Sequence, residues 1–259
     1  MEVIVVDNAS TDQTAAVALA MGAVVIAEPT RNIARARNTG ARSAHGDTLF
    51  FLDADTLVPP TVLSRVARLM SEPRCLGGAI DVRHGPSRVS VRLYLRFWRI
   101  VGRLAGMAQG AAQFWERERF LNLGGYDESM VYEDFDLWLR ITDRFEVRYL
   151  PEVLANFRVL PTSLSHSPER TIDVRESRVR ALSKWFGTSA PIDDVIARRA
   201  WAIGRRTIVD DPRRARGMLR PVLEHQPTLS RRAVYGASYV PGFGQVIRAS
   251  IALRDRLKP

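Results

Sequence analysis

A short apolar run that ends in two acids constrains this chain more than any other stretch of its sequence. Residues 48–52, TLFFL, predict a strand that is buried on both faces of a sheet. Asp53 and Asp55 follow it directly, with only Ala54 between them. Two carboxylates at the end of a buried strand are costly to desolvate unless a cation or a hydrogen-bond donor meets them. The pattern therefore predicts an α/β sheet with a ligand at the carboxyl ends of its strands.

The pair of acids supports two interpretations. Carboxylate oxygens are the donors that Mg²⁺ and Mn²⁺ prefer, and such an ion commonly binds a phosphate group as well. Asp53 and Asp55 then predict a hard-metal site for Mg²⁺ or Mn²⁺. In the alternative, the two acids only begin a turn and cap the next helix. Their position directly after a buried strand favours the metal site.

The N-terminal residues repeat the arrangement of a strand followed by a polar turn. Residues 2–7, EVIVVD, predict a strand that ends in Asp7, and Asn8 opens the turn. A helix and a second strand over residues 23–27 complete a β–α–β unit, which favours a mostly parallel, doubly wound sheet. Asp7 and Asn8 then lie at the same edge as Asp53, where an acid or an amide can hydrogen-bond a nucleobase. A loop that caps its own helix is the other interpretation, and both can hold.

Residues 31–46 form an arginine-rich segment that predicts a loop and a short helix before the central strand. Guanidinium groups of Arg35, Arg37 and Arg42 could bind a diphosphate through their forked donors. A solvated basic helix face explains the same residues equally well.

A second group of acids opens a predicted helix at residues 133–140, EDFDLWLR. Acids in the first turn of a helix oppose its macrodipole, which stabilises the helix by about 0.3–1 kcal/mol each. That effect accounts for one acid better than for the three that are present. A carboxylate held at this position can also take the proton of an attacking hydroxyl group.

Three blocks of the sequence together resemble the family-2 glycosyltransferases. They are EVIVVDNASTDQT, RNIARARNTGARSAHGDTLFFLDADT and GGYDESMVYEDFDLWLRI, in the order and spacing of that family, over roughly residues 1–158. The resemblance implies the nucleotide-sugar-binding fold called GT-A. It also implies an inverting, metal-dependent transfer of a sugar from a nucleotide sugar to a glycan or a lipid-linked acceptor.

The resemblance assigns roles to the two groups of acids. Asp134 matches the catalytic base, and Glu133 supports the acceptor site. Asp53 and Asp55 match the D-x-D motif, with Asp55 the surer metal ligand. A nucleotidyltransferase would share the metal and the phosphate site, but it gives no reason for the acids at Glu133 and Asp134.

The donor side follows from the same resemblance. Asn8, after Asp7, falls where the family usually has an acid that contacts the base of the nucleotide, so the base preference stays open. Arg37 matches a position near the donor phosphates, and Asp53 is also counted among the donor-binding residues. Arg158 and His166 match more loosely, as positions where related enzymes add phosphate or metal contacts. For His166, an exposed loop residue is the favoured interpretation.

Family members normally begin with another strand and helix ahead of the strand at residues 2–7. We therefore expect either a start assigned too late, which is favoured, or a truncated protein with a damaged donor pocket. An unpaired hydrophobic sheet edge promotes aggregation, so we expect the chain alone to express poorly. The alternative to an active enzyme is a catalytically dead, transferase-like partner protein at a membrane surface.

Charge divides the chain into two regions. Residues 1–159 hold 19 basic and 19 acidic side chains, whereas residues 160–259 hold 19 and 9. We predict a catalytic domain over 1–160 and a basic helical appendage over 161–259, with helices at 169–186, 191–209, 212–225 and about 245–257. A basic appendage favours an anionic partner such as a membrane surface. A nucleic-acid partner is not expected, because supporting motifs are missing.

Residues 88–104 predict a basic amphipathic helix with five arginines on one face. Such a helix either lies on an anionic membrane surface or packs on the domain with a solvated arginine face. The sequence has no apolar run of about 18 residues that could span a bilayer. We expect a cytoplasmic protein, peripheral at the inner face of the cell membrane, that acts on cell-envelope polysaccharide.

Overall fold

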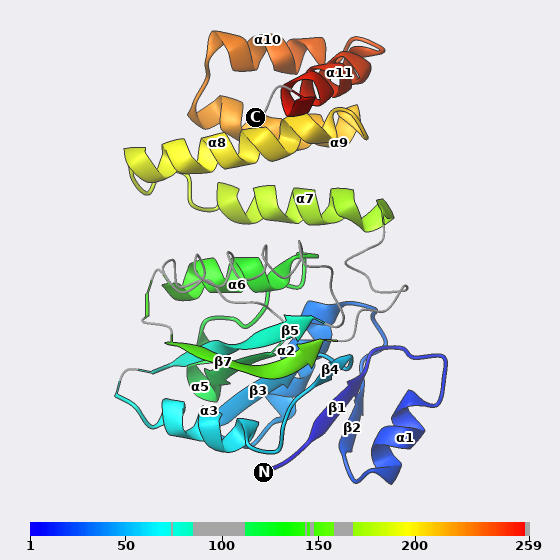
Figure 1. The fold of residues 1–259 in the computed structure, drawn as a ribbon, viewed down its shortest axis with the longest axis vertical. Helices are drawn as coiled ribbons and strands as arrows, with labels where there is room; N and C mark the ends of the chain where they lie inside the picture. The colour runs from blue at the N-terminus through cyan, green and yellow to red at the C-terminus, as the bar shows by residue number, and fades with distance from the viewer. Residues whose placement is uncertain (74, 85–111, 143, 146–147, 158–167, 257–259) are drawn as a thin grey trace. The chain divides into compact units, whose positions relative to one another are not determined.

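The computed structural model describes residues 1–73, 75–84, 112–142, 144–145, 148–157 and 168–256 (Figure 1). The chain divides into two compact units, Met1–Pro161 and Thr162–Pro259. The first unit combines strands and helices, and the second is helical. The helix predicted at 88–104 lies outside the described residues, as do Arg158 and His166.

The strands of the first unit form two sheets, β1–β2 and β3–β6–β5–β7–β4. Their bounds are β1 Ile4–Asp7, β2 Val24–Ala27, β3 Thr48–Leu52, β4 Thr56–Leu57, β5 Gly77–His84, β6 Ala112–Glu116 and β7 Arg148–Phe157. β1 pairs parallel with β2, and β3 pairs with β6. The predicted strands that end at Asp7 and before Asp53 are therefore present, but they belong to different sheets.

The predicted α/β class is confirmed, but the prediction of a mostly parallel sheet is wrong. In the larger sheet β5 pairs parallel with β7, whereas the pairs β3–β6, β5–β6 and β4–β7 are antiparallel. Apolar runs buried on both faces look alike in parallel and antiparallel strands. The sequence pattern therefore did not reveal that β6 inserts between β3 and β5 with the opposite direction.

Helices accompany these strands in the first unit. Their bounds are α1 Thr14–Ala20, α2 Ile33–Ser43, α3 Val62–Met70, α5 Arg117–Asn122 and α6 Glu133–Thr142. The Asn32 side chain accepts a hydrogen bond from the Arg35 amide and so caps α2, which fixes where that helix begins. The predicted helix with three acids in its first turn is α6.

An apolar core supports the end of β3. Its buried members are Ala34, Ala41, Ala44, Leu49, Trp115, Phe120, Tyr126, Leu137 and Ile141. The Phe51 ring packs against Phe120 and Tyr126, with ring centroids 5.2 and 5.4 Å away. This aromatic packing holds β3, α5 and the segment before α6 together next to the acids that follow β3.

The second unit contains the helices α7 Pro168–Ser183, α8 Ala190–Thr207, α9 Pro212–His225, α10 Leu229–Ala237 and α11 Phe243–Arg256. Four of these match the predicted helices, and α10 was not predicted. Gly204 lets α8 approach α9 closely, because a Cβ atom there would lie 2.7 Å from Leu219 Cδ2. Within the described parts of the chain, no helix is long and apolar enough to cross a bilayer.

Candidate active site

Asp53 and Asp55 lie in a tight turn between β3 and β4. The Thr56 amide donates to the backbone oxygen of Asp53 at 2.9 Å, which closes the turn. Thr56 is buried, whereas the two aspartates are partly exposed. The Thr56 hydroxyl lies 3.4 Å from Asp55 Oδ1. The turn therefore places both carboxylates, each partly exposed, at the end of β3.

Arg37 of α2 joins the acids of β3 to those of α6. Its Nη2 donates to Asp53 Oδ1 at 2.6 Å, and its Nη1 donates to Glu133 Oε1 at 2.7 Å. The guanidinium carbon lies 5.3 Å from the centre of the Tyr126 ring, within cation–π range. Only 12% of the Arg37 side chain is exposed. Three of the predicted site residues thus meet in one buried ion-pair cluster.

The two acids that begin α6 have raised pKa values. Burial raises the pKa of Glu133 to about 7, although the positive charge of Arg37 opposes this shift. Burial also raises the pKa of Asp134, and the negative charge of Asp53 adds to that effect. The same two causes act in the β3 turn, where burial and the nearby Asp55 raise the pKa of Asp53. The acids after β3 and those at the start of α6 therefore share one electrostatic environment.

Asp136, the third acid of α6, has a structural role. Its side chain is fully buried, and its Oδ2 accepts from Arg140 Nε at 2.9 Å. The Arg140 guanidinium also donates to the backbone oxygens of Leu123 and Gly125 at 2.7 and 2.6 Å. Asp136 and Arg140 consequently fasten α6 to the segment that precedes it, which leaves Glu133 and Asp134 as the candidate functional acids.

The oxygen donors after β3 fit a hard divalent cation in part. Asp55 offers a half-buried carboxylate with one long hydrogen bond, while one oxygen of Asp53 is already bound by Arg37. Across the described ranges, no group of three or more His, Cys, Asp or Glu side chains is arranged to hold a metal ion. Mg²⁺ and Mn²⁺ commonly complete their coordination with phosphate oxygens and water. The two aspartates could therefore supply the protein's share of such a site.

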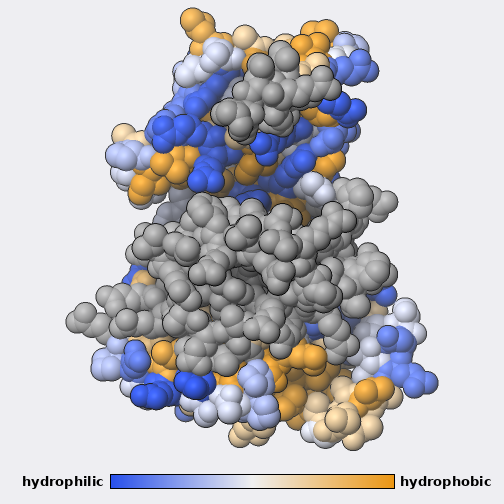
Figure 2. Space-filling view, in the orientation of Figure 1, coloured by the Kyte–Doolittle hydropathy of each residue, from blue (hydrophilic) through white to orange (hydrophobic). Residues whose placement is uncertain are grey.

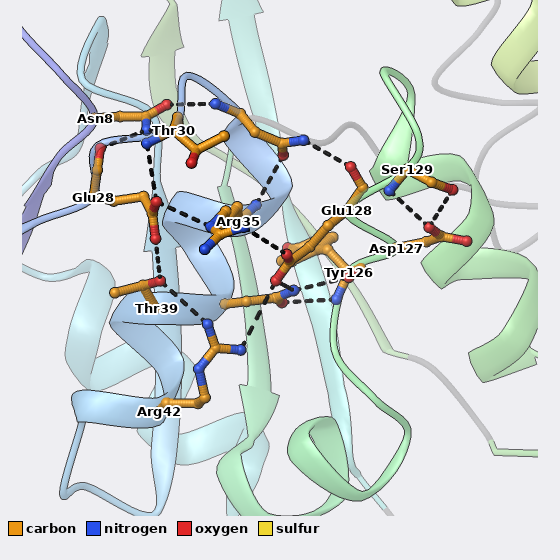
Figure 3. A network of polar contacts seen from close by, with 12 residues as sticks. Asn8, Glu28, Thr30, Arg35, Thr39, Arg42, Tyr126, Asp127, Glu128 and Ser129 are labelled. Carbon is orange, nitrogen blue, oxygen red and sulfur yellow. Dashed lines mark hydrogen bonds and ion pairs between the residues drawn. The ribbon is translucent and has the colours of Figure 1, made fainter.

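Asn8, one of the two predicted base-side residues, belongs to a second polar network (Figure 3). The Asn8 amide nitrogen donates to the backbone oxygens of Glu28 and Thr30, and its side-chain oxygen accepts from the Asn32 amide at 2.9 Å. Asp7 Oδ1 accepts from the Ser10 amide at 3.1 Å. The Asn8 side chain thus holds the loop between β2 and α2 against the end of β1.

Figure 3 also shows how α2 joins this loop to the segment before α6. The Glu28 carboxylate accepts hydrogen bonds from Arg35 Nε at 3.0 Å and Thr39 Oγ1 at 3.1 Å. Arg35 and Arg42 also approach the carboxylate of Glu128, at 4.0 and 3.9 Å. The arginines predicted to bind a diphosphate, or to form a solvated face, are therefore engaged with acids of the protein.

Sequence reasoning missed the residues that hold this arrangement in place. Asn38 is buried, and its side chain accepts from the Tyr126 amide at 2.9 Å and donates to the Tyr126 carbonyl at 2.8 Å. Glu28 is an isolated acid without a motif around it. Glu128 lies in the GGYDES block, which was the one available signal. Glu28 has its partners Arg35 and Thr39 only 7 and 11 residues away, but no motif signals these pairs. Asn38 and Tyr126 lie 88 residues apart, a distance that neither spacing nor periodicity could have bridged.

Residues 1–120 match the model of the glycosyl transferase family 2. The N-terminal part of the chain, 120 of its 259 residues, is thus similar to the family-2 glycosyltransferases. The matched residues include Arg37, Asp53 and Asp55, whereas Glu133 and Asp134 follow them. Comparison of the sequence with curated proteins gave no match.

Solved structures show the fold of this chain independently. TarS of S. aureus, residues 1–349 with UDP-GlcNAc, is 16% identical, with a TM-score of 0.64 over 92% of this chain and 80% of that one. The mannosyltransferase PcManGT of Pyrobaculum calidifontis, with GDP-Man and Mn²⁺, is 19% identical, with a TM-score of 0.59 over 98% of this chain and 74% of that one. GalNAc-T7, with UDP, GalNAc and Mn²⁺, is 20% identical, with a TM-score of 0.52 over 72% of this chain and 42% of that one. The predicted GT-A fold is thereby confirmed.

Proposed function

We propose that this glycosyltransferase moves a sugar from a nucleotide-sugar donor to a hydroxyl group of its acceptor in a single inverting displacement. The observation that carries the proposal is the cluster around Arg37, which gathers Asp53 from the end of β3 and Glu133 from the start of α6. The base and the group that stabilises the leaving diphosphate must flank one sugar ring. The start of α6 would provide the base, and the end of β3 would provide the stabilising group.

The chemistry requires one base and one stabilised leaving group. As the acceptor oxygen bonds to the anomeric carbon of the donor sugar, its proton passes to the Asp134 carboxylate. The bond between the anomeric carbon and the diphosphate oxygen breaks, and its electron pair leaves with the nucleoside diphosphate. A divalent cation bound by Asp55 and Asp53, Mg²⁺ or Mn²⁺, would neutralise the charge that develops on the diphosphate.

Asp134 is a better candidate for the base than Glu133. Glu133 is bound by Arg37 at 2.7 Å, so its charge is already engaged. The Asp134 carboxylate accepts a hydrogen bond from the Phe135 amide at 2.8 Å and forms no ion pair among the described residues. Burial raises the pKa of Asp134, which brings its basicity closer to that of a useful proton acceptor. Glu133 then supports the acceptor side.

The donor class rests on the similar structures. TarS was solved with UDP-GlcNAc and PcManGT with GDP-Man and Mn²⁺, so both take nucleotide sugars. For this chain we propose a nucleotide sugar of either kind, with Asp7 and Asn8 near the base and Asp53 near the diphosphate. Because the Asn8 side chain is bonded to three backbone groups, its contribution would be to shape the loop that meets the base.

The acceptor we propose is a glycan or a lipid-linked sugar of the cell envelope, reached by a cytoplasmic protein at an anionic membrane surface. The excess of ten positive charges in residues 160–259 supports this location. Vesicles that contain anionic lipid should bind the protein, and rising salt should release it. Equal binding to neutral vesicles would contradict a charge-driven location.

Two substitutions test the proposed function. Asp134→Asn should reduce the transfer rate by about 10²–10⁴-fold, because the base is lost. It should leave the Mn²⁺-dependent binding of UDP or GDP intact. Asp55→Ala should remove both transfer and metal-dependent nucleotide binding. A screen of nucleotide sugars for transfer and donor hydrolysis, followed by isothermal titration calorimetry, gives both readouts.

The matched control is Asp194→Asn in the helical unit. Asp194 is half-exposed and pairs with Arg198 at 2.6 Å on the surface of α8. This substitution removes the same charge outside the site, and we expect wild-type kinetics. Full transfer activity in Asp134→Asn would remove Asp134 as the base.

A further inference from the structure

The guanidinium group of Arg37 is already bound by two carboxylates of the protein. Its guanidinium group donates to Asp53 and Glu133 at once, and only 12% of the side chain is exposed. To turn toward a phosphate, it would have to leave two carboxylates, of which Glu133 is only 5% exposed. A buried carboxylate without its counter-charge is strongly disfavoured. The geometry therefore opposes the sequence-based role of Arg37 as a donor-phosphate ligand.

The surface on which the guanidinium group lies is itself fixed. Tyr126 is 1% exposed, and Asn38 binds both its amide and its carbonyl. The Tyr126 hydroxyl donates to Gln113 Oε1 of β6 at 3.1 Å. The aromatic ring thus has no freedom to follow the arginine, and Arg37 keeps one position between the two acids.

We propose that Arg37 is a positioning residue that fixes the spacing between the donor-side acid Asp53 and the acceptor-side acid Glu133. It acts on the reaction through these acids and through Asp134, which follows Glu133 at the start of α6. The inference rests on the proposed function, because it assumes that the two groups of acids serve the two substrates. Shifts of about 1 Å between reacting groups reduce rates by about 10²-fold.

The role needs a guanidinium group and not just a positive charge. Arg37 uses two different nitrogens for two acids that lie 16 and 96 residues from it in the chain. The lysine ammonium is a compact point charge on a flexible stem, so it can pair with one acid but cannot set the spacing of both. Charge and geometry can therefore be separated by substitution.

The experiment compares Arg37→Lys with the double variant Arg37→Gln/Glu133→Gln. The double variant removes Glu133, the more deeply buried of the two carboxylates, together with Arg37. Only Asp53, whose side chain is 29% exposed, loses its partner, so the double variant should fold even if Arg37→Gln alone does not. Calorimetry measures the Mn²⁺-dependent binding of UDP and of GDP, and steady-state kinetics gives kcat and the donor KM. Arg198→Gln, which removes an exposed arginine from a surface pair on α8, is the control.

A positioning residue and a phosphate ligand predict different results. We expect nucleotide affinity and donor KM within about three-fold of wild type in both variants, and kcat lowered by about 10–100-fold. A loss of nucleotide affinity of ten-fold or more in both variants would overturn the inference, because Arg37 would then hold the diphosphate. A wild-type kcat in Arg37→Lys would overturn it as well.

The failure of this inference can be told apart from the failure of the proposed function. A wild-type protein that binds UDP or GDP but transfers no sugar would contradict the proposed transfer, while the binding data would still decide whether Arg37 contacts the diphosphate. A wild-type protein that binds neither nucleotide would overturn both.

Discussion

The two sheets of the first unit are stabilised in different ways. Within residues 1–27, which form β1, α1 and β2, no residue is buried. In the larger sheet, Ala79, Ile80 and Phe114 are completely buried. Figure 2 shows apolar surface over the β1–α1–β2 segment. Its exposed side chains include Val3, Val17, Leu19, Met21 and Val24, each more than half exposed.

Polar contacts compensate in part for the missing burial. Glu2 Oε1 accepts from the amides of His45 and Gly46 at 2.7 and 3.0 Å, just before β3. At the other end of β1, Asn8 bonds to the loop before α2, as Figure 3 shows. The comparison teaches that a hydrophobic core supports the acids of the site, while the proposed nucleotide-base side depends on hydrogen bonds. We expect the second region to open first.

The largest effect should come from the core of the larger sheet. Phe114→Ala should lower the free energy of unfolding by about 3–5 kcal/mol, because it removes a fully buried ring and leaves a cavity. Urea denaturation, followed by tryptophan fluorescence, measures the change. A loss below about 1 kcal/mol would show that this sheet is no better packed than the β1–α1–β2 segment.

A smaller effect on the free energy of unfolding should follow from pH. The acids near the larger sheet are buried, whereas those of the β1–α1–β2 segment are exposed to water. Burial raises the pKa of Glu133 from its usual 4.5 to about 7, so the folded state holds that proton more tightly than the unfolded state. Its contribution to stability is then complete below pH 4.5 and is lost as the pH rises through 7, on the order of 2–3 kcal/mol.

Urea denaturation between pH 4.5 and 8, in buffer with a chelator, should show this decline in the wild type. Glu133→Gln should show a flatter dependence, because its side chain cannot ionise. The same decline in both proteins would assign the pH dependence to other groups. Asp12 of the N-terminal segment is exposed, and hydrogen bonds from Thr14 lower its pKa, so it should add nothing to this decline.

The smallest effect should come from α1. Val17→Ala and Leu19→Ala should each change the free energy of unfolding by less than about 0.5 kcal/mol, since both side chains are more than half exposed. Hydrogen exchange of the wild type should show faster exchange in β1 and β2 than in β6. A loss above 1.5 kcal/mol in either variant would mean that α1 is covered in solution.

Much of the site could be predicted because its signals are local. A buried strand that ends in acids, and a helix that begins with acids, are visible within ten residues of sequence, and they gave Asp53, Asp55, Glu133 and Asp134. The antiparallel β6 was not predictable, because an apolar run does not encode the direction of its neighbour. Asp136 and Arg140 form a local i,i+4 pair in α6. The backbone oxygens of Leu123 and Gly125 that Arg140 also binds lie outside the helix, so the structural role of the pair was not visible in the sequence.

The sequence by itself determined the class of fold, the order of its blocks and the acids that end β3 and begin α6. Only the tertiary structure decided that Arg37 lies between Asp53 and Glu133, 16 and 96 residues away in the chain. Periodicity reports how each residue faces its own element, which is a local property of the backbone. The choice of a partner for a buried charge depends on which elements pack together, and that is settled only when the core forms.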